Sequence, residues 1–370
     1  MKTLLPILLF AATCSAAVST IRVPNGGIQP QLVERDGVVH LIYFTGEPAT
    51  GNLFYVNSRD YGQTFSKPLA VNQTPGSAIA VGNIRGAQLA VGRNGRVHVA
   101  WNGTAPTGHL PMYYARLNDA GSAFEPDRNL IKAAYGLDGG GSLAADNQGN
   151  VYVFWHAPQP GTKGEENRRV WVAKSTNDGK DFEPERMAFD KPTGACGCCG
   201  MKAFADNTGA VYVMFRSAEK TVNRDIWLLS STDHGRTFTG ADISHWNIGA
   251  CVMSSEAFAQ APNGILAAWE TEKQTYFGVV QPGTSKVSKP VAAPGVPVNR
   301  KYPVIAANAK GETLFAWTEG MAWKKGGGVE WQVYDKDSHA QGAAGKAAGV
   351  PVWGVIAAFA KPDGGFVVMY

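Results

Sequence analysis

Four cysteines give this chain its most conspicuous chemistry. Cys196, Cys198 and Cys199 fall within four positions, and Cys251 follows later in a chain that has only 5 cysteines. Clustered thiolates bind soft metals such as Cu(I) or Zn(II), whereas the same residues form disulfides in an oxidising compartment. A direct bridge between Cys198 and Cys199 would be strained. We therefore expect two disulfides, with one of these two neighbours paired to Cys251, and copper or zinc at the four thiolates is the alternative.

The first residues favour the disulfides because they predict export. The segment MKTLLPILLFAATCSAA has one lysine, an apolar run and then small residues, which is typical of a signal peptide over residues 1–17. We expect a secreted or periplasmic protein. The residues before Cys14 lack the leucine and the small residue of a lipoprotein signal, so no lipid anchor is expected there. No later stretch reaches the ~20 apolar residues of a membrane span.

The composition favours many short strands joined by tight turns. The chain has 44 glycines and 21 prolines, together with 10 tryptophans, 12 tyrosines and 16 phenylalanines. No segment has a long amphipathic helical period. The net charge of +4 is spread along the chain without a basic tract, so nucleic acid is not an expected partner. The sequence does not specify an oligomeric state.

A repeat predicts how these strands are arranged. One phrase occurs four times at separations of 59, 58 and 56 residues: SRDYGQTF from Ser58, LNDAGSAF from Leu117, STNDGKDF from Ser175 and STDHGRTF from Ser231. A strand precedes each copy, and further upstream a glycine turn leads into alternating apolar residues. Each unit is thus a four-stranded antiparallel meander. Such sheets must stack on one another to bury both faces, which predicts an all-β fold with one β-propeller domain over residues 18–370.

The number of blades is left open by the sequence. We find six complete units but seven inner strands, because the C-terminal GVIAAFAKPDGGFVVMY begins a further unit. Either an N-terminal strand around residues 20–23 completes a seventh blade, or the last hairpin packs outside the ring.

Residues just before each innermost strand meet at one axial end of a propeller, which we call the mouth. The positions predicted to lie there are Ile28, Arg85, Asp138, Cys196 to Cys199, Cys251, Glu256, Arg300, Lys301, Tyr302 and Trp353. Polar, charged and sulfur-containing side chains gather at these positions, while the strands are apolar. The sequence therefore predicts a functional site at the mouth.

The repeated phrase resembles the Asp box, or BNR repeat, of the sialidase-like β-propellers. The copies at Ser58 and Ser231 match the pattern Ser-x-Asp-x-Gly-x-Thr-aromatic fully, and the other two are degenerate. The chain also resembles a bacterial subgroup that carries a Cys-x-Cys-Cys segment. The resemblance implies six blades, and it implies an exported protein that acts on glycans, plausibly as a glycoside hydrolase of the exo-sialidase type.

The resemblance also implies roles for residues at the mouth. Sialidases grip an acidic sugar with arginines and attack it with a tyrosine that a glutamate activates. The arginines of this chain that point to the mouth are Arg85, Arg216 and Arg300. Tyr302 corresponds to the nucleophile, Glu256 is the substitute for the base, and Asp138 is the candidate for the general acid. Ile28 stands where the family has its first arginine.

Structural roles are the alternative for each of these residues. Arg85 and Arg216 can be held by a neighbouring acid or by carbonyls between blades, and Tyr302 can pack its ring beside Pro303. The alternative functions are a propeller that binds a glycan or a protein without catalysis, and a propeller that binds a metal through Cys196, Cys198, Cys199 and Cys251.

Overall fold

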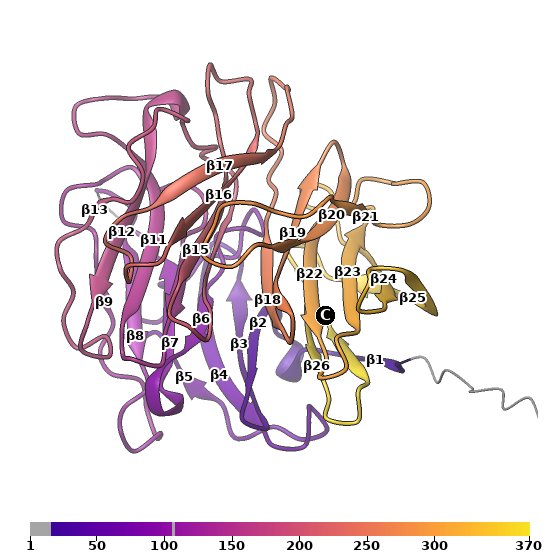
Figure 1. Ribbon diagram of the computed structural model, residues 1–370. Helices are drawn as coiled ribbons and strands as arrows, with labels where there is room; N and C mark the ends of the chain where they lie inside the picture. The colour runs from indigo at the N-terminus through magenta and orange to yellow at the C-terminus, as the bar shows by residue number, and fades with distance from the viewer. Residues whose placement is uncertain (1–15, 106–107) are drawn as a thin grey trace, which may run out of the picture.

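The computed structural model describes residues 16–105 and 108–370, which form seven sheets around one axis (Figure 1). The colour in Figure 1 runs once around the ring, and the innermost strands of consecutive sheets contact one another all the way round. The all-β propeller prediction is therefore confirmed. Most of the predicted signal peptide, with Cys14, lies outside the described residues.

Six blades are four-stranded antiparallel meanders in sequence order, with the first strand innermost. Blade 1 contains β2 (Ile28–Arg35), β3 (Val38–Glu47), β4 (Thr50–Ser58) and β5 (Leu69–Ala70). Blade 2 contains β6 (Gln88–Val91), β7 (Val97–Asn102), β8 (Met112–Arg116) and β9 (Arg128–Asn129). Blade 3 contains β10 (Ser142–Ala145), β11 (Val151–Pro158), β12 (Arg168–Ser175) and β13 (Arg186–Met187).

The next three blades continue the same order. Blade 4 contains β14 (Met201–Ala205), β15 (Val211–Arg216), β16 (Ile226–Ser231) and β17 (Thr239–Ser244). Blade 5 contains β18 (Ala257–Ala261), β19 (Gly264–Thr271), β20 (Gln274–Val280) and β21 (Val291–Ala292). Blade 6 contains β22 (Lys301–Ala307), β23 (Thr313–Glu319), β24 (Gly327–Tyr334) and β25 (Ala340–Val350). Three short 3-10 helices lie between strands: η1 (Pro24–Gly26), η2 (Arg93–Gly95) and η3 (Glu165–Asn167).

The seventh blade joins the two ends of the described chain. It contains β26 (Ala357–Ala360) and β27 (Phe366–Met369), and the N-terminal strand β1 (Val18–Ile21) pairs in parallel with β27. Because β1 covers an edge that the C-terminal hairpin would leave unpaired, the ring closes at seven blades. The N-terminal strand proposed from the sequence is confirmed, two residues earlier than expected, and the six blades implied by the resemblance are not what this chain forms.

Apolar side chains between neighbouring sheets hold the ring together. Trp101, Trp155, Trp269 and Trp317 occupy equivalent positions on the second strands of four blades, and each is almost completely buried. Burial of so much aromatic surface is the main stabilising contribution to such stacked sheets. No helix in residues 16–105 or 108–370 is long and apolar enough to cross a membrane.

The repeated phrases form turns at the end of the ring opposite the mouth, which we call the far end. In the first copy, the Ser58 hydroxyl donates to Asp60 Oδ1 at 2.7 Å and accepts from the Gly62 amide at 2.8 Å, and Asp60 accepts from the Thr64 amide at 2.8 Å. The copy at Ser231 repeats these bonds around Asp233. Each turn thus satisfies its own polar groups, which explains why the phrase recurs.

Candidate functional site

The mouth contains the start of every inner strand and, because neighbouring strands are antiparallel, the end of every second strand. Residues that begin β18 and β22 therefore meet residues that end β15 and β19. This topology brings Tyr302 and Glu256 together with Arg216 and Glu270.

A loop covers the axis at the mouth. Ile84, which precedes β6 of blade 2, belongs to a buried apolar cluster whose other members lie in blades 6 and 7 or at the N-terminus. If Gly140 carried a Cβ, that atom would lie only 1.8 Å from the backbone oxygen of Ile84. A Cβ at Gly200 would lie 3.6 Å from the Cβ of Ile84. A residue that touches blades on opposite sides of the ring must lie across the axis. Glycine at position 140 is therefore required by the close approach of this loop, whereas a side chain at position 200 would only touch it.

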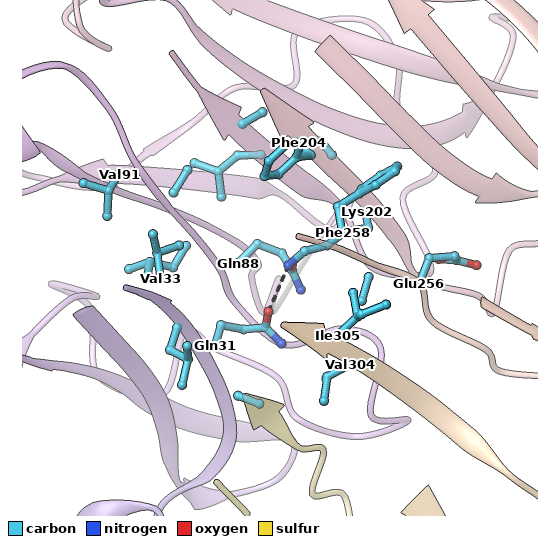
Figure 2. A pocket seen from close by; sticks show the side chains of 18 of the residues that line it. Gln31, Val33, Gln88, Val91, Lys202, Phe204, Glu256, Phe258, Val304 and Ile305 are labelled. Atoms are coloured by element: carbon cyan, nitrogen blue, oxygen red, sulfur yellow. Dashed lines mark hydrogen bonds between the residues drawn. The ribbon is translucent and has the colours of Figure 1, made fainter. Parts of the chain in front are cut away.

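The axis below this loop is a cavity of about 500 Å³ that residues of all seven inner strands line. Figure 2 shows side chains from several of these strands around it. At the far end its lining includes the exposed residues Asp36, Asn147 and Asn207, whereas the lining residues Ile84 and Tyr302 at the mouth are buried. The cavity therefore opens at the far end and is closed at the mouth, which is the end where the sequence predicted the functional site.

Tyr302 lies at the closed end of this cavity in an unusual backbone conformation. Its φ is 49°, and the pairing of β22 with β23 is irregular between Lys301 and Val304. Its ring is buried, and its hydroxyl has no hydrogen-bond partner within the described part of the chain. Burial, followed by the charges of Glu270 and Cys199, raises the pKa of Tyr302. A left-handed conformation at a non-glycine residue is strained, and such strain is often found at functional sites.

Two buried glutamates of blade 5 lie near Tyr302. Neither carboxyl oxygen of Glu256 has a hydrogen-bond partner among the described residues, and Figure 2 shows this side chain pointing away from the side chains at the centre of the cavity. Burial raises the pKa of Glu256 well above its usual value, although Arg216 acts in the opposite direction. Glu270 accepts from Lys301 Nζ at 3.2 Å, and burial raises its pKa too. Burial therefore favours the protonated form of Glu256, which is the form that can donate a proton.

Arg216 is held entirely by the protein. Its Nε donates to the Ser254 hydroxyl at 2.7 Å, and its other nitrogens donate to the backbone oxygens of Arg224 and Glu270. Its guanidinium also lies 5.2 Å from the ring centre of Trp246. These bonds join blades 4 and 5. The residue is only 1% exposed, so its guanidinium is not available to bind the carboxylate of a substrate.

Arg300 has the same structural character. It bonds Glu319 Oε2 at 3.0 Å and Gln274 Oε1 at 3.0 Å, and it donates to the backbone oxygens of Ala293 and Pro294. The residue is 2% exposed. The three arginines do not converge on one ligand site, because Arg216 and Arg300 are each saturated by groups of their own and the neighbouring blade.

Arg85 and Asp138 meet at the surface of the mouth. Arg85 Nη2 lies 2.6 Å from Asp138 Oδ1, and Arg85 Nε donates to the Asp138 backbone oxygen at 2.8 Å. Their side chains are 20% and 44% exposed. The arginine is thus held by a neighbouring acid, which was the structural alternative, but both groups still face solvent.

An aromatic pair lies beside Arg85. The Trp323 and Trp353 rings meet edge to face with their centres 4.7 Å apart, and Trp323 is 54% exposed. A Cβ added to Gly82 would lie 2.6 Å from Arg85 Nη1 and 3.9 Å from a ring carbon of Trp323. Trp323 comes from the loop after β23, so blades 6 and 7 present an aromatic surface next to the polar pair of blades 2 and 3. We call Trp323, Trp353, Arg85 and Asp138 the mouth surface.

The cysteines join blades 4 and 5. Cys198 forms a disulfide with Cys251, which confirms the predicted link to Cys251 and selects Cys198 over Cys199. Cys196 and Cys199 are buried, and their sulfurs are 2.6 Å apart, so they are placed to pair with each other. The sulfurs of Cys196, Cys198 and Cys199 lie within 4.8 Å of one another, but the disulfide removes Cys198 as a thiolate. Two remaining thiols do not fill a tetrahedral site, so the residues present do not fit zinc while the disulfide is intact.

A ring of polar residues at the mouth was predicted from the sequence only at Arg216. The residue that follows the last aromatic residue of the second strand is Asn102, His156, Arg216, Glu270 and Thr318 in blades 2 to 6, and all five are buried. A comparison of the sequences that end these strands would have identified Glu270 as the residue of blade 5 that is equivalent to Arg216 of blade 4. Lys202, which lies inside the cavity, had no such signal because it is a single lysine in the short strand β14.

Comparisons with solved structures support the fold. The chain is similar to the Hadza microbial sialidase Hz136 with a TM-score of 0.54 and 11% identity, over 85% of this chain and 69% of that one. A Trypanosoma rangeli sialidase in complex with the inhibitor DANA is similar with a TM-score of 0.53 and 12% identity, over 84% of this chain and 56% of that one. A Penicillium chrysogenum alpha-L-arabinanase complexed with arabinobiose is similar with a TM-score of 0.53 and 12% identity, over 85% of this chain and 95% of that one. No family model and no curated protein sequence matches the chain.

Proposed function

We propose that this propeller recognises a glycan at the mouth surface. The observation that carries the proposal is the half-exposed Trp323 indole, which stands against Trp353 and beside the Arg85–Asp138 pair. Sugars present apolar C–H faces and hydroxyl edges, and a site for them combines an aromatic face with a few fixed polar groups. The sialidases and the arabinanase that share the fold act on or bind glycans by their names, which supports the same ligand class.

The polar pair suits hydroxyl groups better than a free anion. Arg85 already bonds Asp138, so the pair supplies donors and an acceptor with little net charge. The exposed lysines Lys324 and Lys325 flank Trp323 in the same loop and add positive charge. This distribution favours a glycan whose sugar stacks on Trp323 while an acidic group, where one is present, faces the two lysines.

A glycan-binding assay tests this proposal. We expect retention on immobilised or arrayed glycans to fall by about tenfold in Trp323→Ala, because the loss of an aromatic contact costs about 1–2 kcal/mol. Trp246→Phe is not a suitable control because that ring contacts Arg216. Val296→Ala is suitable, since Val296 is 86% exposed and precedes blade 6. Equal retention by the wild type and Trp323→Ala would contradict the proposal.

Glycoside hydrolysis is the second candidate function, and Tyr302 favours it. Its unpartnered hydroxyl lies near the buried Glu270, and Glu256 is in the lining of the same cavity. In hydrolysis the Tyr302 oxygen would bond to the anomeric carbon while the bond to the leaving oxygen breaks. The tyrosine proton would pass to Glu270, and the leaving oxygen would take a proton from Glu256. Water would then release the sugar and restore the protons.

Turnover of aryl glycosides separates the two functions. If the chain is a hydrolase, Tyr302→Phe should lose release of 4-methylumbelliferone from acidic and neutral glycosides by several hundredfold or more, as expected for loss of a nucleophile. Tyr113→Phe is the matched control, because Tyr113 is half-buried on β8 and far from the cavity lining. If the protein binds a glycan but hydrolyses none of the glycosides in the panel, hydrolysis is excluded for these substrates and only the binding function is supported.

A thiol count tests the metal-binding alternative. The expected second disulfide between Cys196 and Cys199 predicts no free thiols in unreduced protein purified from its native compartment. Four free thiols together with bound copper or zinc would favour the metal-binding propeller instead.

A further inference from the structure

The axial cavity contains a lysine that neither candidate function uses. Lys202 extends from β14 of blade 4 toward the opposite side of the ring, where its Nζ donates to Gln88 Oε1 at 2.9 Å and to Gln31 Oε1 at 3.1 Å. Figure 2 shows the ammonium group between these two amides, with Phe204 and Phe258 nearby. Protein surrounds Lys202 on all sides, yet its side chain remains partly accessible because it lines the cavity.

No carboxylate neutralises this charge. Lys202 takes part in no ion pair within the described residues, although the cavity lining includes Glu34, Asp36, Asp146, Asp206 and Glu256. Asp146 and Asp206 accept hydrogen bonds from the backbone of their own turns at the far end. Burial lowers the pKa of Lys202 to about 8, without a compensating contribution from an acid. A buried charge is normally paired, so this lysine lacks its partner.

The remaining acids of the lining are also not partners of Lys202. The Glu256 carboxyl points away from the lysine in Figure 2. Glu34 accepts from the Gly37 amide at 3.0 Å, and Asp36 is exposed at the far opening next to Arg35.

The two glutamines provide further donors beside the lysine. An ammonium group can only donate, so the amide oxygens of Gln31 and Gln88 must face it and their NH2 groups must point to other parts of the cavity. Neither NH2 group has a protein acceptor among the described residues. Lys202 itself has three protons and uses two of them on the amides. This stretch of the cavity therefore offers several unpaired donors.

We propose that the axial cavity binds a carboxylate-bearing small molecule, with the carboxylate accepting a hydrogen bond from Lys202 and entering through the far end. The cavity of about 500 Å³ has room for an acid of monosaccharide size, and the loop at Ile84 stops passage to the mouth. Apolar residues such as Phe204 and Phe258, whose ring centres are 5.8 Å apart, face the rest of such a ligand. This site is separate from the mouth surface and does not depend on the proposed function.

The site is tested by titration of protein labelled with carbon-13 at the lysine side chains, with sodium acetate and sodium glucuronate in separate arms and glucose as the neutral control. The Lys202 signal is assigned by its absence in Lys202→Met. We expect this signal to shift and saturate with a carboxylate and to be unchanged by glucose. Saturation by both acids identifies a general carboxylate site, whereas saturation by glucuronate alone identifies an acidic sugar as the ligand.

Calorimetry on variants gives an independent measurement. We expect Lys202→Met to bind the active carboxylate about tenfold or more weakly, because a hydrogen bond to a charged group is lost. Lys289→Met, which removes an exposed lysine near β21, should bind as the wild type does. Gln88→Leu keeps the lysine and should weaken binding to a smaller degree. No shift with either acid, or equal affinity in Lys202→Met and the wild type, would overturn the proposal.

Discussion

Charged side chains at the far end bond to groups of opposite charge, whereas Arg216 and Glu256 at the mouth do not, although Arg300 and Lys301 there pair with acids. At the far end, Arg116 forms two bonds of 2.7 Å to Glu125, and Arg96 Nε bonds Asp178 at 2.9 Å. At the mouth, Arg216 bonds only neutral oxygens, and Glu256 has no hydrogen-bond partner among the described residues.

The pKa directions follow the same division. Hydrogen bonds from Thr64 and Ser58 lower the pKa of Asp60 at the far end to about 2, while burial raises the pKa of Glu256 and Glu270 at the mouth. The turn carboxylates Asp60 and Asp233 at the far end are satisfied by neighbours in the sequence, because each turn bonds to itself. Mouth groups come from different blades and depend on one another over longer distances. The difference teaches that the repeat satisfies polar groups locally at one end, whereas the buried groups Arg216 and Glu256 at the other end have no such local partners.

The largest effect should come from replacing a mouth arginine. We expect Arg216→Met to lower the free energy of unfolding by about 3–5 kcal/mol, because it leaves buried acceptors unpaired and removes the charge that faces Glu256. Guanidinium unfolding followed by tryptophan fluorescence measures this loss. Arg116→Met at the far end should cost less, since Glu125 is 35% exposed and water can solvate it. Equal losses would remove the distinction between the two ends.

The second largest loss of stability should come from removing the Cys198–Cys251 disulfide. Cys198 and Cys251 are 53 residues apart in sequence, and their bridge ties blade 4 to blade 5 at the mouth. Replacing both with serine should lower the free energy of unfolding by about 2–4 kcal/mol, since the unfolded chain loses a constraint. The same unfolding experiment checks this, and in the presence of reductant the wild type and the variant should unfold at the same midpoint. An unchanged midpoint in both cases would refute the expectation.

Glu256→Gln should stabilise the protein at neutral pH by about 1–3 kcal/mol, because the amide is neutral at every pH, whereas the buried carboxyl must take up a proton or carry a buried charge. The folded-state pKa of Glu256 is raised, so wild-type stability is unaffected below its unfolded pKa of ~4.3 and falls as the pH rises toward the folded value. The advantage of the variant should therefore grow with pH from ~4.3 upward. Melting temperatures measured across this range test the sign, and an advantage that does not change with pH would contradict it.

The smallest effect should come from the far-end turns, with the opposite pH dependence. Because the folded pKa of Asp60 is lowered to about 2, its contribution is present above its unfolded pKa of ~3.9 and is lost as the pH falls through this interval. Asp60→Asn should melt slightly below the wild type at neutral pH and match it in acid. Asp190→Asn, at an exposed aspartate, is the control. A gap that widens in acid would be evidence against the role of these turn bonds.

Much of the architecture could be predicted because it is encoded locally. The phrase at Ser58 contains the hydroxyl, the carboxylate and the glycine that its own turn needs, and its recurrence reveals the sheets. The inner strands begin close to where the sequence placed them, for example at Gln88, Ser142 and Met201. The mouth residues could be named for the same reason, since their positions relative to the strands repeat.

The partners of those residues could not be predicted. The choice of Cys198 over Cys199 depends on which sulfur faces blade 5, and the fate of Arg216 and Arg300 depends on carbonyls that only the folded ring brings near. The covering of the axis by Ile84 and the unpaired charge of Lys202 arise from contacts across the ring.

The sequence by itself determined the antiparallel meanders, their turns and the end of the ring at which polar groups gather, because each depends on residues a few positions apart. Only the tertiary structure decided that the ring closes at seven blades through β1, that the mouth is covered and that the cavity opens at the far end. These outcomes depend on how many sheets fit around the axis and on which side chains meet across it, and such distances are fixed only when the ring has closed.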